Sequence, residues 1–424
     1  MLAKRLADFE ARTVDATQAG LPLADLWASL AEAPDEAAAT LRLLRAYAPI
    51  WAAGGTRPPP ASLEGVDLQA LSPEALAELR AAIDAGVASG QLAAPSGATA
   101  RELPGTGWRE AFIGGSASAE EAHYARIAEQ IRAQQALQAE AADGRPRRAF
   151  HAKGLGLKAR FTVAADLAPE LRVGLLQPGA AYDAVVRLSN AADADDREPN
   201  LHGLAVRIAD GSPTGQDFLC TSAPVSHVAD AAGQAEVGLA LAHGTLKGAL
   251  KLLFSRGPVF TVKVLSTLSK QTKTRATSLA ALSYYSRAPF RFGPVAARFL
   301  FRPVNPGPAP GFDGPHRLTA DLTHRLKAGP LRWELALQRF VSEAATPIEQ
   351  GDAAWPLDVA PAEVIGTLEI PAQDVDGAAE EALARDVEGW SFSPFNTVHH
   401  TPLGRLNRGR RVAYDASVAG RGGR

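Results

Sequence analysis

Residues 148–156 read Arg-Ala-Phe-His-Ala-Lys-Gly-Leu-Gly and mark the point where the character of the sequence changes. Helical patterns precede this stretch, whereas 158–163 alternates in side-chain character, as a half-buried strand does. Gly154 and Gly156 allow the backbone to come close to whatever lies beside His151. A single histidine is more often a hydrogen-bonded structural residue, so the meaning of His151 depends on the segments that follow it.

The composition is that of a globular protein. The chain has 424 residues, 46% of them hydrophobic and 21% charged, with a net charge of -2. This length favours one large domain and a smaller one, and the small net charge gives no reason to expect nucleic acid or an anionic membrane as partner. No apolar run is long enough to span a membrane. With a single cysteine, Cys220, and no secretory pattern at the start, we expect a cytoplasmic protein.

The first third of the chain predicts helices. Residues 1–144 contain no cluster of metal ligands, no phosphate-binding loop and no paired nucleophile and base. One helix is expected to begin at Ser118, with Glu121 completing a capping box. Its inward positions would be Tyr124, Ile127 and Ile131. We therefore predict an all-helical N-terminal region over 1–144 that serves packing or oligomerisation, or acts as a lid on a site in the second domain.

Residues 145–424 predict a mixed α+β domain. Short strand-like runs are separated by turn sequences, which favours antiparallel pairing in a barrel or sandwich. The region 235–283 looks helical, and a basic helix is expected over 404–419. The strand-like runs are 158–163, 182–189, 203–209, 216–221, 290–292, 297–301, 331–337 and 363–370.

Five segments, taken in order, resemble the haem catalase superfamily and in particular its smaller bacterial catalase-related members. Residues 148–154 are similar to the distal-histidine motif, and Val-Arg-Leu-Ser at 186–189 is similar to a Val-Arg-Phe-Ser strand. Gly-Leu-Ala-Val-Arg at 203–207 resembles a Gly-Phe-Ala-Val-Lys strand, and 217–224 resembles the distal-asparagine segment. Residues 390–414 resemble the closing segment of the catalase-related group. The resemblance implies a catalase-like antiparallel β-barrel with surrounding helices and haem b as cofactor.

The resemblance implies that Tyr414 is the axial ligand of the haem iron. Arg410 stands four residues earlier, on the same face of the predicted helix. A guanidinium beside a phenol favours the phenolate, and an anionic oxygen ligand stabilises ferric iron. The residues that match the family's propionate-binding arginines are Arg148, Arg187 and Arg421, and arginine suits that role because it makes two-point contacts with carboxylates.

On the opposite face of the haem, the resemblance implies that His151 is the general base. It would take a proton from a bound hydroperoxide and return it to the leaving oxygen. Ser189 matches the serine that orients this imidazole. Ser222 stands where catalases carry the distal asparagine, and its shorter hydroxyl would act through a water molecule. The family's phenylalanine-rich segment that follows is absent here.

That segment is replaced by residues 225–234, which include His227 and Gln234. His227 would be either a second polar group in the pocket or a surface residue, and Gln234 or a neighbour would replace the phenylalanine over the haem. The distal side would thus be more open and more polar than in catalases. The adjacent pair His399 and His400 resembles metal ligands, but neighbouring residues seldom share one metal, so we interpret the pair as structural.

These expectations favour a haem-dependent enzyme that acts on a hydroperoxide, or that oxidises a small organic substrate with peroxide. A catalase that dismutates hydrogen peroxide is one alternative, and a haem-binding protein with little catalysis is another. The expected partners are a hydroperoxide or peroxide together with a small organic substrate, and a homo-oligomer is possible. No nucleic acid and no membrane span are expected.

Overall fold

The computed structural model describes residues 100–102, 106–140, 154–191, 195–198, 200–211, 215–273, 275–397 and 400–420. The chain divides into two compact units, Met1–His123 and Tyr124–Arg424. The predicted division into 1–144 and 145–424 stays a prediction. His151, Arg148 and Arg421 lie outside the described residues, as does His399.

In the first unit, a short antiparallel hairpin pairs β1 (Ala100–Glu102) with β2 (Arg109–Ala111). The all-helical character expected for this region therefore does not extend to the hairpin. Helix α5 (Ala117–Glu140) begins in this unit, and its residues from Tyr124 onward belong to the second unit. The expected capping box at Ser118 is not the cap observed, because the hydroxyl of Ser116 accepts the backbone N–H of Ala119 at 3.1 Å. The predicted inward positions of α5, Tyr124, Ile127 and Ile131, are buried.

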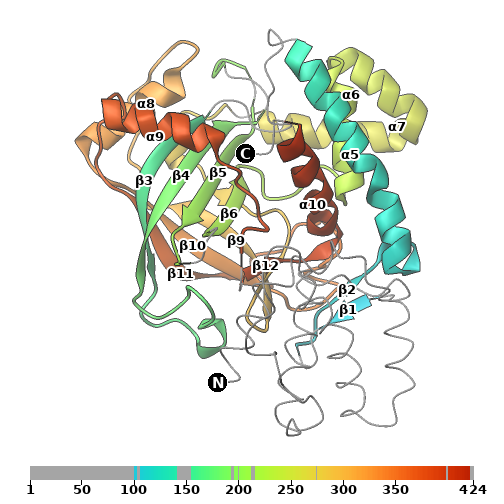
Figure 1. Cartoon of the computed structure of the whole chain (residues 1–424), viewed down its shortest axis with the longest axis horizontal. Coiled ribbons are helices and arrows are strands. Elements are labelled where there is room, and N and C mark those ends of the chain that lie inside the picture. The colour runs from blue at the N-terminus through green and yellow to red at the C-terminus, as the bar shows by residue number, and fades with distance from the viewer. Residues whose placement is uncertain are drawn as a thin grey trace, which may run out of the picture. The chain divides into compact units, whose positions relative to one another are not determined.

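The second unit is built around an antiparallel β-barrel (Figure 1). Strands pair in the order β10-β11-β3-β4-β5-β6-β7-β9, and β9 also pairs with β10, which closes the circle. Strands β8 and β12 extend the sheet beyond β9. The barrel strands are β3 (Gly154–Val163), β4 (Ala181–Asn190), β5 (His202–Ile208), β6 (Gln216–Thr221), β7 (Tyr284–Tyr285), β9 (Val295–Pro303), β10 (Leu331–Arg339) and β11 (Ala362–Ile370). The two extensions are β8 (Phe290–Phe292) and β12 (His400–Pro402).

Alternate residues of these strands fill the barrel with aromatic rings. Phe299 lies at the centre of the cluster, with edge-on contacts to Phe218 at 5.1 Å and to Phe290 at 4.8 Å between ring centroids. Trp333 is fully buried in the same core. Such edge-to-face pairs add about 0.5–1.5 kcal/mol beyond the area that they bury. The period-two patterns of the sequence thus correctly predict an α+β fold whose strands have one buried face.

Helices surround the barrel. Helix α9 (Ala378–Gly389) packs on β3, where a side chain on Gly156 would come within 2.9 Å of Val387, so this glycine is what admits the helix. Helices α6 (Ala231–Ala242) and α7 (Thr245–Thr272) form a hairpin, and α7 is kinked at Gly257 and Pro258. Helix α8 (Arg317–Ala328) follows β9, and α10 (Gly404–Ala419) ends the described chain. None of the described helices has the length and apolar character needed to cross a bilayer.

Helix α10 lies beside β6, between the barrel and α6 (Figure 1). Its close seating depends on Gly409, because a side chain there would come within 2.7 Å of Ala231 on α6 and of Tyr124 on α5. The hydroxyl of Tyr124 donates to the backbone carbonyl of Arg405 at 2.7 Å. These contacts fix the distance between α10 and the barrel wall. They therefore also fix the positions of the α10 side chains that face that wall.

Candidate functional site

A cavity of about 200 Å³ lies between the outer side of the barrel wall and helices α6 and α10. Strands β4, β5 and β6 form the wall, and their residues alternate: Arg187, Ser189 and Ala205 line the cavity, whereas Val186 and Val206 fill the barrel. Leucine and alanine side chains make up much of the remaining lining. A concave, mostly apolar site with a few polar groups is the usual form of a site for a small molecule or cofactor.

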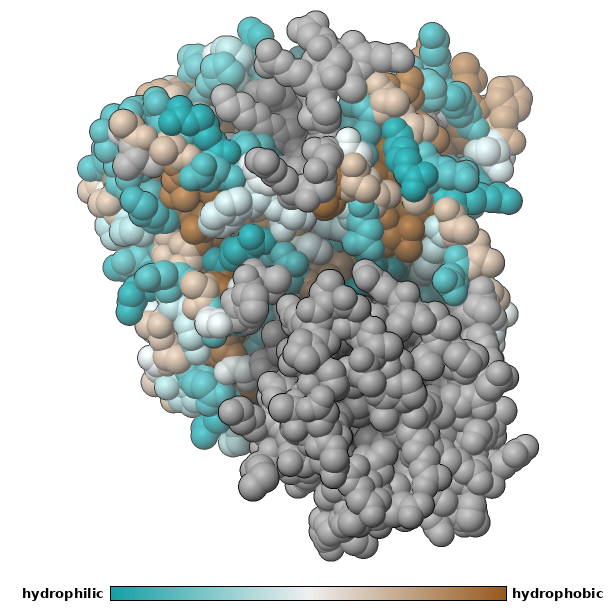
Figure 2. Space-filling view, in the orientation of Figure 1, coloured by the Kyte–Doolittle hydropathy of each residue, from teal (hydrophilic) through white to brown (hydrophobic). Residues whose placement is uncertain are grey.

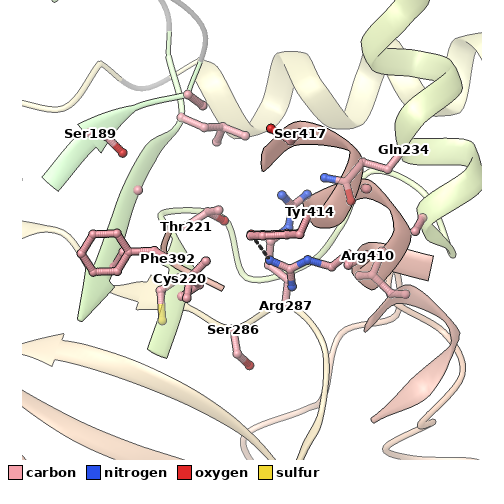
Figure 3. Close-up of a pocket in the computed structure, with 18 of the residues that line it drawn as sticks. Ser189, Cys220, Thr221, Gln234, Ser286, Arg287, Phe392, Arg410, Tyr414 and Ser417 are labelled. Carbon is pink, nitrogen blue, oxygen red and sulfur yellow. Dashed lines mark hydrogen bonds between the residues drawn. The ribbon is translucent and has the colours of Figure 1, made fainter. Parts of the chain in front are cut away.

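Tyr414 and Arg410 enter this cavity from α10 (Figure 3). One guanidinium nitrogen of Arg410 donates to the Tyr414 hydroxyl oxygen at 3.1 Å, and another donates to the side-chain oxygen of Asn407 at 3.2 Å. Asn407 is itself fixed, since its amide donates to the backbone carbonyls of Pro289 and Leu403. The predicted spacing of four residues therefore gives a hydrogen-bonded pair, and this pair faces a cavity.

Arg187 and Ser189 approach from the barrel side, on β4. The register of β3 and β4 sets Gly156 opposite Arg187 and Gly154 opposite Ser189. Arg187 is 4% exposed and forms an ion pair at 3.0 Å with Glu388 of α9. Figure 3 shows Ser189, Cys220 and Phe392 on one side of the cavity, with Arg410 and Tyr414 on the other. The structure thus brings together four of the predicted site residues: Arg187, Ser189, Arg410 and Tyr414.

Ser222 is not among the residues that line the cavity. Its hydroxyl accepts the backbone N–H of His202 at 3.0 Å, and its own N–H donates to the His202 carbonyl at 2.8 Å. Its neighbour Thr221 borders the cavity instead. The predicted distal role of Ser222 therefore gains no support from the described contacts, because the hydroxyl is used to extend the pairing of β5 and β6.

His227 does line the cavity, as does Gln234 from α6. Both ring nitrogens of His227 are shielded from solvent and have no hydrogen-bond partner among the residues that the structure describes. Burial lowers the pKa of His227 to about 3, and the charge of Arg287 acts in the same direction. Of the two expectations for His227, the pocket residue is the one observed, and its imidazole is neutral at physiological pH.

Arg287 is a cavity residue that the sequence did not predict. It is 8% exposed and has a φ angle of 63°, in the left-handed region. Its Nε donates to the carbonyl of Val225 at 3.0 Å, while Nη2 has no hydrogen-bond partner in the described part of the chain. Burial, together with the nearby charge of Arg410, lowers the pKa of Arg287 to about 10. The only sequence signal was a lone cation in the otherwise uncharged run between the aromatic pairs at 284–285 and 290–292.

His400, the remaining candidate histidine, packs against an aromatic ring. His400 is buried in β12 and stacks on Phe292, with ring centroids 5.2 Å apart. Within the part of the chain that the structure describes, no group of three or more histidine, cysteine or acidic side chains is arranged to hold a metal ion. The described contacts are thus consistent with a structural role for His400.

Solved structures share this fold. A bacterial catalase matches with a TM-score of 0.52 at 17% identity, over 67% of this chain and 59% of its own. A fungal catalase gives 0.53 at 17% identity, over 68% and 62%. Catalase A from Saccharomyces cerevisiae gives 0.52 at 14% identity, over 68% and 63%. The barrel has the catalase fold.

This likeness is one of structure. No protein-family model matches the sequence, and no curated protein matches it significantly. The chain spans about three-fifths of the length of the catalases that it resembles. The catalase-like barrel is therefore established for the second unit, while the chemistry of its cavity has to be argued from the residues that line it.

Proposed function

We propose that the protein is a haem-dependent oxidoreductase that acts on a hydroperoxide, with Tyr414 as the axial ligand and His151 as the acid and base. The observation that carries this proposal is the Arg410–Tyr414 pair, which faces the cavity of a catalase-like barrel (Figure 3). In an ordinary surface pair of this spacing, neither side chain would border a cavity.

The donor set fits a ferric haem. Tyr414 offers a phenolic oxygen, and the hydrogen bond from Arg410 favours its ionised form. An anionic oxygen ligand stabilises ferric iron. The apolar wall, which includes Leu219 and Ala413, suits the flat hydrophobic face of a porphyrin. Haem b bound here would supply a redox-active iron, which the side chains of the protein cannot provide themselves.

Arg187 would hold one of the haem carboxylates, together with Arg148 and Arg421. Its present partner, Glu388, has a side chain that is 35% exposed, so this carboxylate can turn into solvent when another takes its place. Arginine suits such an exchange because its planar fork accepts either carboxylate in the same geometry. Haem uptake would then replace one ion pair of Arg187 with another and would leave no buried cation unpaired.

The proton transfers are assigned to His151. Its neutral imidazole would accept the proton of a bound hydroperoxide and then donate it to the distal oxygen, which leaves as water or as an alcohol. Ser189 would fix the orientation of the ring, and it borders the cavity at the point where β4 pairs with the first residue of β3. A neutral, oriented imidazole is required because only an unprotonated nitrogen can accept the first proton.

The substrate is proposed to be an organic hydroperoxide, or an organic compound oxidised with peroxide. The apolar lining and the replacement of the family's phenylalanine-rich segment by one that brings His227 and Gln234 into the cavity both favour a substrate larger than hydrogen peroxide. Purified, haem-loaded protein given each peroxide in turn separates the alternatives. Consumption of cumene hydroperoxide without oxygen release supports the proposal, whereas vigorous oxygen release from hydrogen peroxide indicates a catalase.

The ligand assignment is tested by spectroscopy. Tyr414→Phe should abolish the ferric absorption spectrum of the tyrosinate-ligated protein, while Tyr182→Phe is the matched control. Tyr182 lies outside the cavity lining, and its hydroxyl donates to the carbonyl of Leu175 at 2.8 Å. An unchanged haem spectrum in Tyr414→Phe would show that the axial assignment is wrong.

The enzymatic assignment needs a second variant, because haem binding alone is also the property of a carrier or sensor. His151→Ala should keep the haem spectrum of the parent protein and lose most hydroperoxide turnover. General acid–base catalysis typically contributes on the order of 10²–10⁴-fold, so a large loss is expected. Turnover that is unchanged in His151→Ala would favour a haem-binding protein with little catalysis.

A further inference from the structure

We propose that the outer face of helix α7 docks on an anionic lipid surface. The helix runs over Thr245–Thr272 and is kinked at Gly257 and Pro258. Three features of α7 support this, and none of them involves the haem cavity. Large apolar side chains are exposed along the helix, several of its lysines have no carboxylate partner in the described structure, and its inner face is packed so that the helix cannot turn over.

The exposed apolar side chains of α7 recur at helical spacing. Before the kink, Leu246, Leu250 and Phe254 follow one another at intervals of four residues, with exposed fractions of 76%, 47% and 86%. After the kink, Val259 and Val262 are 83% and 66% exposed. Side chains four residues apart lie on the same side of a helix. Single exposed apolar residues are ordinary on protein surfaces, whereas a row of them marks an interaction site.

The inner face of α7 is fixed against α6 and the barrel. A side chain on Gly248 would come within 2.6 Å of a backbone carbonyl oxygen of α6, so the two helices approach closely there. Leu252 follows four residues later and is fully buried, and Val264 is buried in the same cluster beyond the kink. Near the end of the helix, the amide of Gln271 donates to the backbone carbonyl of Val225 at 3.0 Å. The helix therefore cannot bury its outer face by rotation without losing these contacts.

The charges of α7 are all of one sign. The helix contains five basic residues and no acidic residue. Two of the five form ion pairs with carboxylates of neighbouring segments, Arg256 with Glu236 and Lys263 with Asp352. The other three form no ion pair with the residues that the structure describes: Lys247, Lys251 and Lys270. Three positive charges thus accompany the exposed apolar side chains.

Lys247 and Lys251 lie at one edge of the apolar row and do not interrupt it. Each directly follows an exposed leucine, Leu246 or Leu250, and successive residues of a helix point about 100° apart. A lysine can lay its methylene groups along an apolar surface and extend its ammonium group beyond it. Figure 2 shows apolar and hydrophilic side chains next to one another at the upper right of the molecule, over α6 and α7.

This combination is typical of helices that lie in the plane of a membrane surface. Such helices set leucine and phenylalanine side chains into the boundary between headgroups and acyl chains, while their lysines contact anionic headgroups. The net charge of -2 gave no reason to expect this partner. A net charge sums over the whole sequence, however, and a local group of lysines on one helix does not show in it.

A lipid surface fits the outer face of α7 better than another protein does. Pairing with a second copy about a two-fold axis would bring the lysines of one copy against those of the other. A groove on a different protein receives a helix between two walls, and α6 already occupies the inner side of α7. A lipid surface needs only the outer side, and its anionic headgroups neutralise the lysines.

The test is sedimentation of the full-length protein with vesicles of phosphatidylcholine, with and without roughly one-third phosphatidylserine. Binding is expected only to the anionic vesicles. Phe254→Glu should weaken it by about tenfold or more, because it places a negative charge within the apolar row and against negative headgroups. Leu357→Glu is the matched control, since Leu357 is 64% exposed and lies outside α7. Equal stability of the two variants in urea would verify that both are folded.

The lysines are tested by a change of charge. Lys251→Glu should weaken binding to anionic vesicles by about tenfold, and salt at about 0.5 M should weaken the binding of the parent protein, because salt screens exposed charges. Arg385→Glu, at an exposed position on α9, changes the net charge by the same amount and is the matched control. Its binding should equal that of the parent protein.

A fluorescent label distinguishes insertion from electrostatic attachment. Phe254→Cys can be labelled selectively, because Cys220, the one cysteine of the chain, is buried. The emission of an environment-sensitive dye at this position should shift to the blue when anionic vesicles are added, since the dye enters the apolar boundary of the bilayer. The same dye on Leu357→Cys should show no shift.

Absence of binding to anionic vesicles overturns the inference, as does binding that both Phe254→Glu and Lys251→Glu leave unchanged. Binding without a blue shift at position 254 also overturns it, because another face would then carry the attachment. A dimer that Phe254→Glu dissociates, without vesicle binding, would assign the outer face of α7 to self-association. Since vesicle binding requires no haem, these results do not depend on whether the protein takes up the cofactor.

Discussion

Two regions of the second unit each bury an arginine, and the two side chains differ in their hydrogen-bond partners. Arg298, on β9, is 4% exposed, and its two terminal nitrogens donate to the carbonyls of Ala353 and Gln350 at 2.7 Å and 3.0 Å. Its guanidinium also lies 4.8 Å from the centre of the Trp355 ring. Arg287, at the cavity, has a single carbonyl contact, through Nε, and its Nη2 has no partner in the described structure. In Arg298 the nitrogen without a partner there is Nε, and both terminal nitrogens are bound. Burial lowers the pKa of both to about 10.

The buried histidines repeat this contrast. His202, on β5, has its Nδ1 at 2.9 Å from the side-chain oxygen of Asn190, whose amide donates to Asp196 at 2.9 Å. In the described structure His227, at the cavity, has no partner on either ring nitrogen. Buried atoms without a partner also lie away from the cavity, among them Nε of Arg298. At the cavity they are both nitrogens of an imidazole and a terminal nitrogen of a guanidinium. Unsatisfied buried groups are rare in folded proteins, so we expect a ligand to complete the hydrogen bonding of His227 and Arg287.

The largest expected effect is the loss of stability in acid. The pKa of His202 is lowered from 6.5 to about 4, and that of His227 from 6.5 to about 3. Between these values and pH 6.5 the unfolded chain binds protons that the folded chain does not, so the free energy of unfolding decreases as the pH falls below 6.5. Between pH 7 and pH 4.5 each histidine should contribute about 2–3 kcal/mol to the fall.

Urea denaturation at pH 7, 5.5 and 4.5 measures this fall. His227→Leu should remove the contribution of His227 to the fall in the free energy of unfolding and leave that of His202. It should not lower stability at pH 7, because no hydrogen bond to His227 is broken. His202→Leu should lower stability at pH 7, because it removes the hydrogen bond to the side-chain oxygen of Asn190. An equal loss at pH 7 in both variants would contradict the contrast between the two sites.

The arginines give the next largest effect. Arg298→Met would leave two buried carbonyl groups without a hydrogen-bond donor, at a cost of roughly 1–3 kcal/mol each. Arg287→Met strands only the Val225 carbonyl and removes an unpaired buried cation, so the free energy of unfolding should change by less than about 1 kcal/mol or even rise. The two variants are compared in urea at pH 7 without ligand. Equal destabilisation would show that Arg287 is a structural residue like Arg298.

The same contrast explains what the sequence could predict. Alternating patterns predicted the barrel strands, because each has one face in a continuous core. The spacing of Arg410 and Tyr414 predicted their contact, because neighbours on a helix are set by local geometry. Arg287 was missed because its burial depends on α10 and the segment at 225–227, which are distant in sequence.

The sequence also could not predict which of two neighbouring residues faces the cavity. The resemblance places Ser222 in the site, and in the structure its neighbour Thr221 borders the cavity. In an extended chain the side chain changes faces with every residue, so a match of short segments does not decide which of two neighbours faces a cavity. The hairpin of β1 and β2 was missed for a related reason, since three-residue strands are too short to show an alternating pattern.

A smaller effect is expected from changing Gly409, on which the close packing of α10 depends. The position of α10 sets the distance between Tyr414 and the barrel wall. Gly409→Ala would place a methyl group within 2.7 Å of Ala231 and Tyr124. Overpacking typically costs about 1–3 kcal/mol, and the higher helix propensity of alanine offsets about 1 kcal/mol of this. A net loss of about 1–2 kcal/mol is expected, measured by urea denaturation. Gly389→Ala is the control, since nothing lies within 4 Å of its added methyl group, and stability there should be unchanged or higher.

The smallest effect concerns Cys220, the one cysteine of the chain, which borders the cavity from β6. Burial raises the pKa of the thiol well above its usual value, and the opposing influence of Arg410 is smaller. The thiolate is the form that reacts with alkylating agents and peroxides, so the folded protein should resist iodoacetamide at pH 8, whereas the unfolded protein reacts fully. A thiol that reacted readily with peroxide would compete with His151 for the proposed substrate. Rapid labelling in the folded state, followed by mass spectrometry, would show that the barrel side of the cavity is open and less apolar than its contacts indicate.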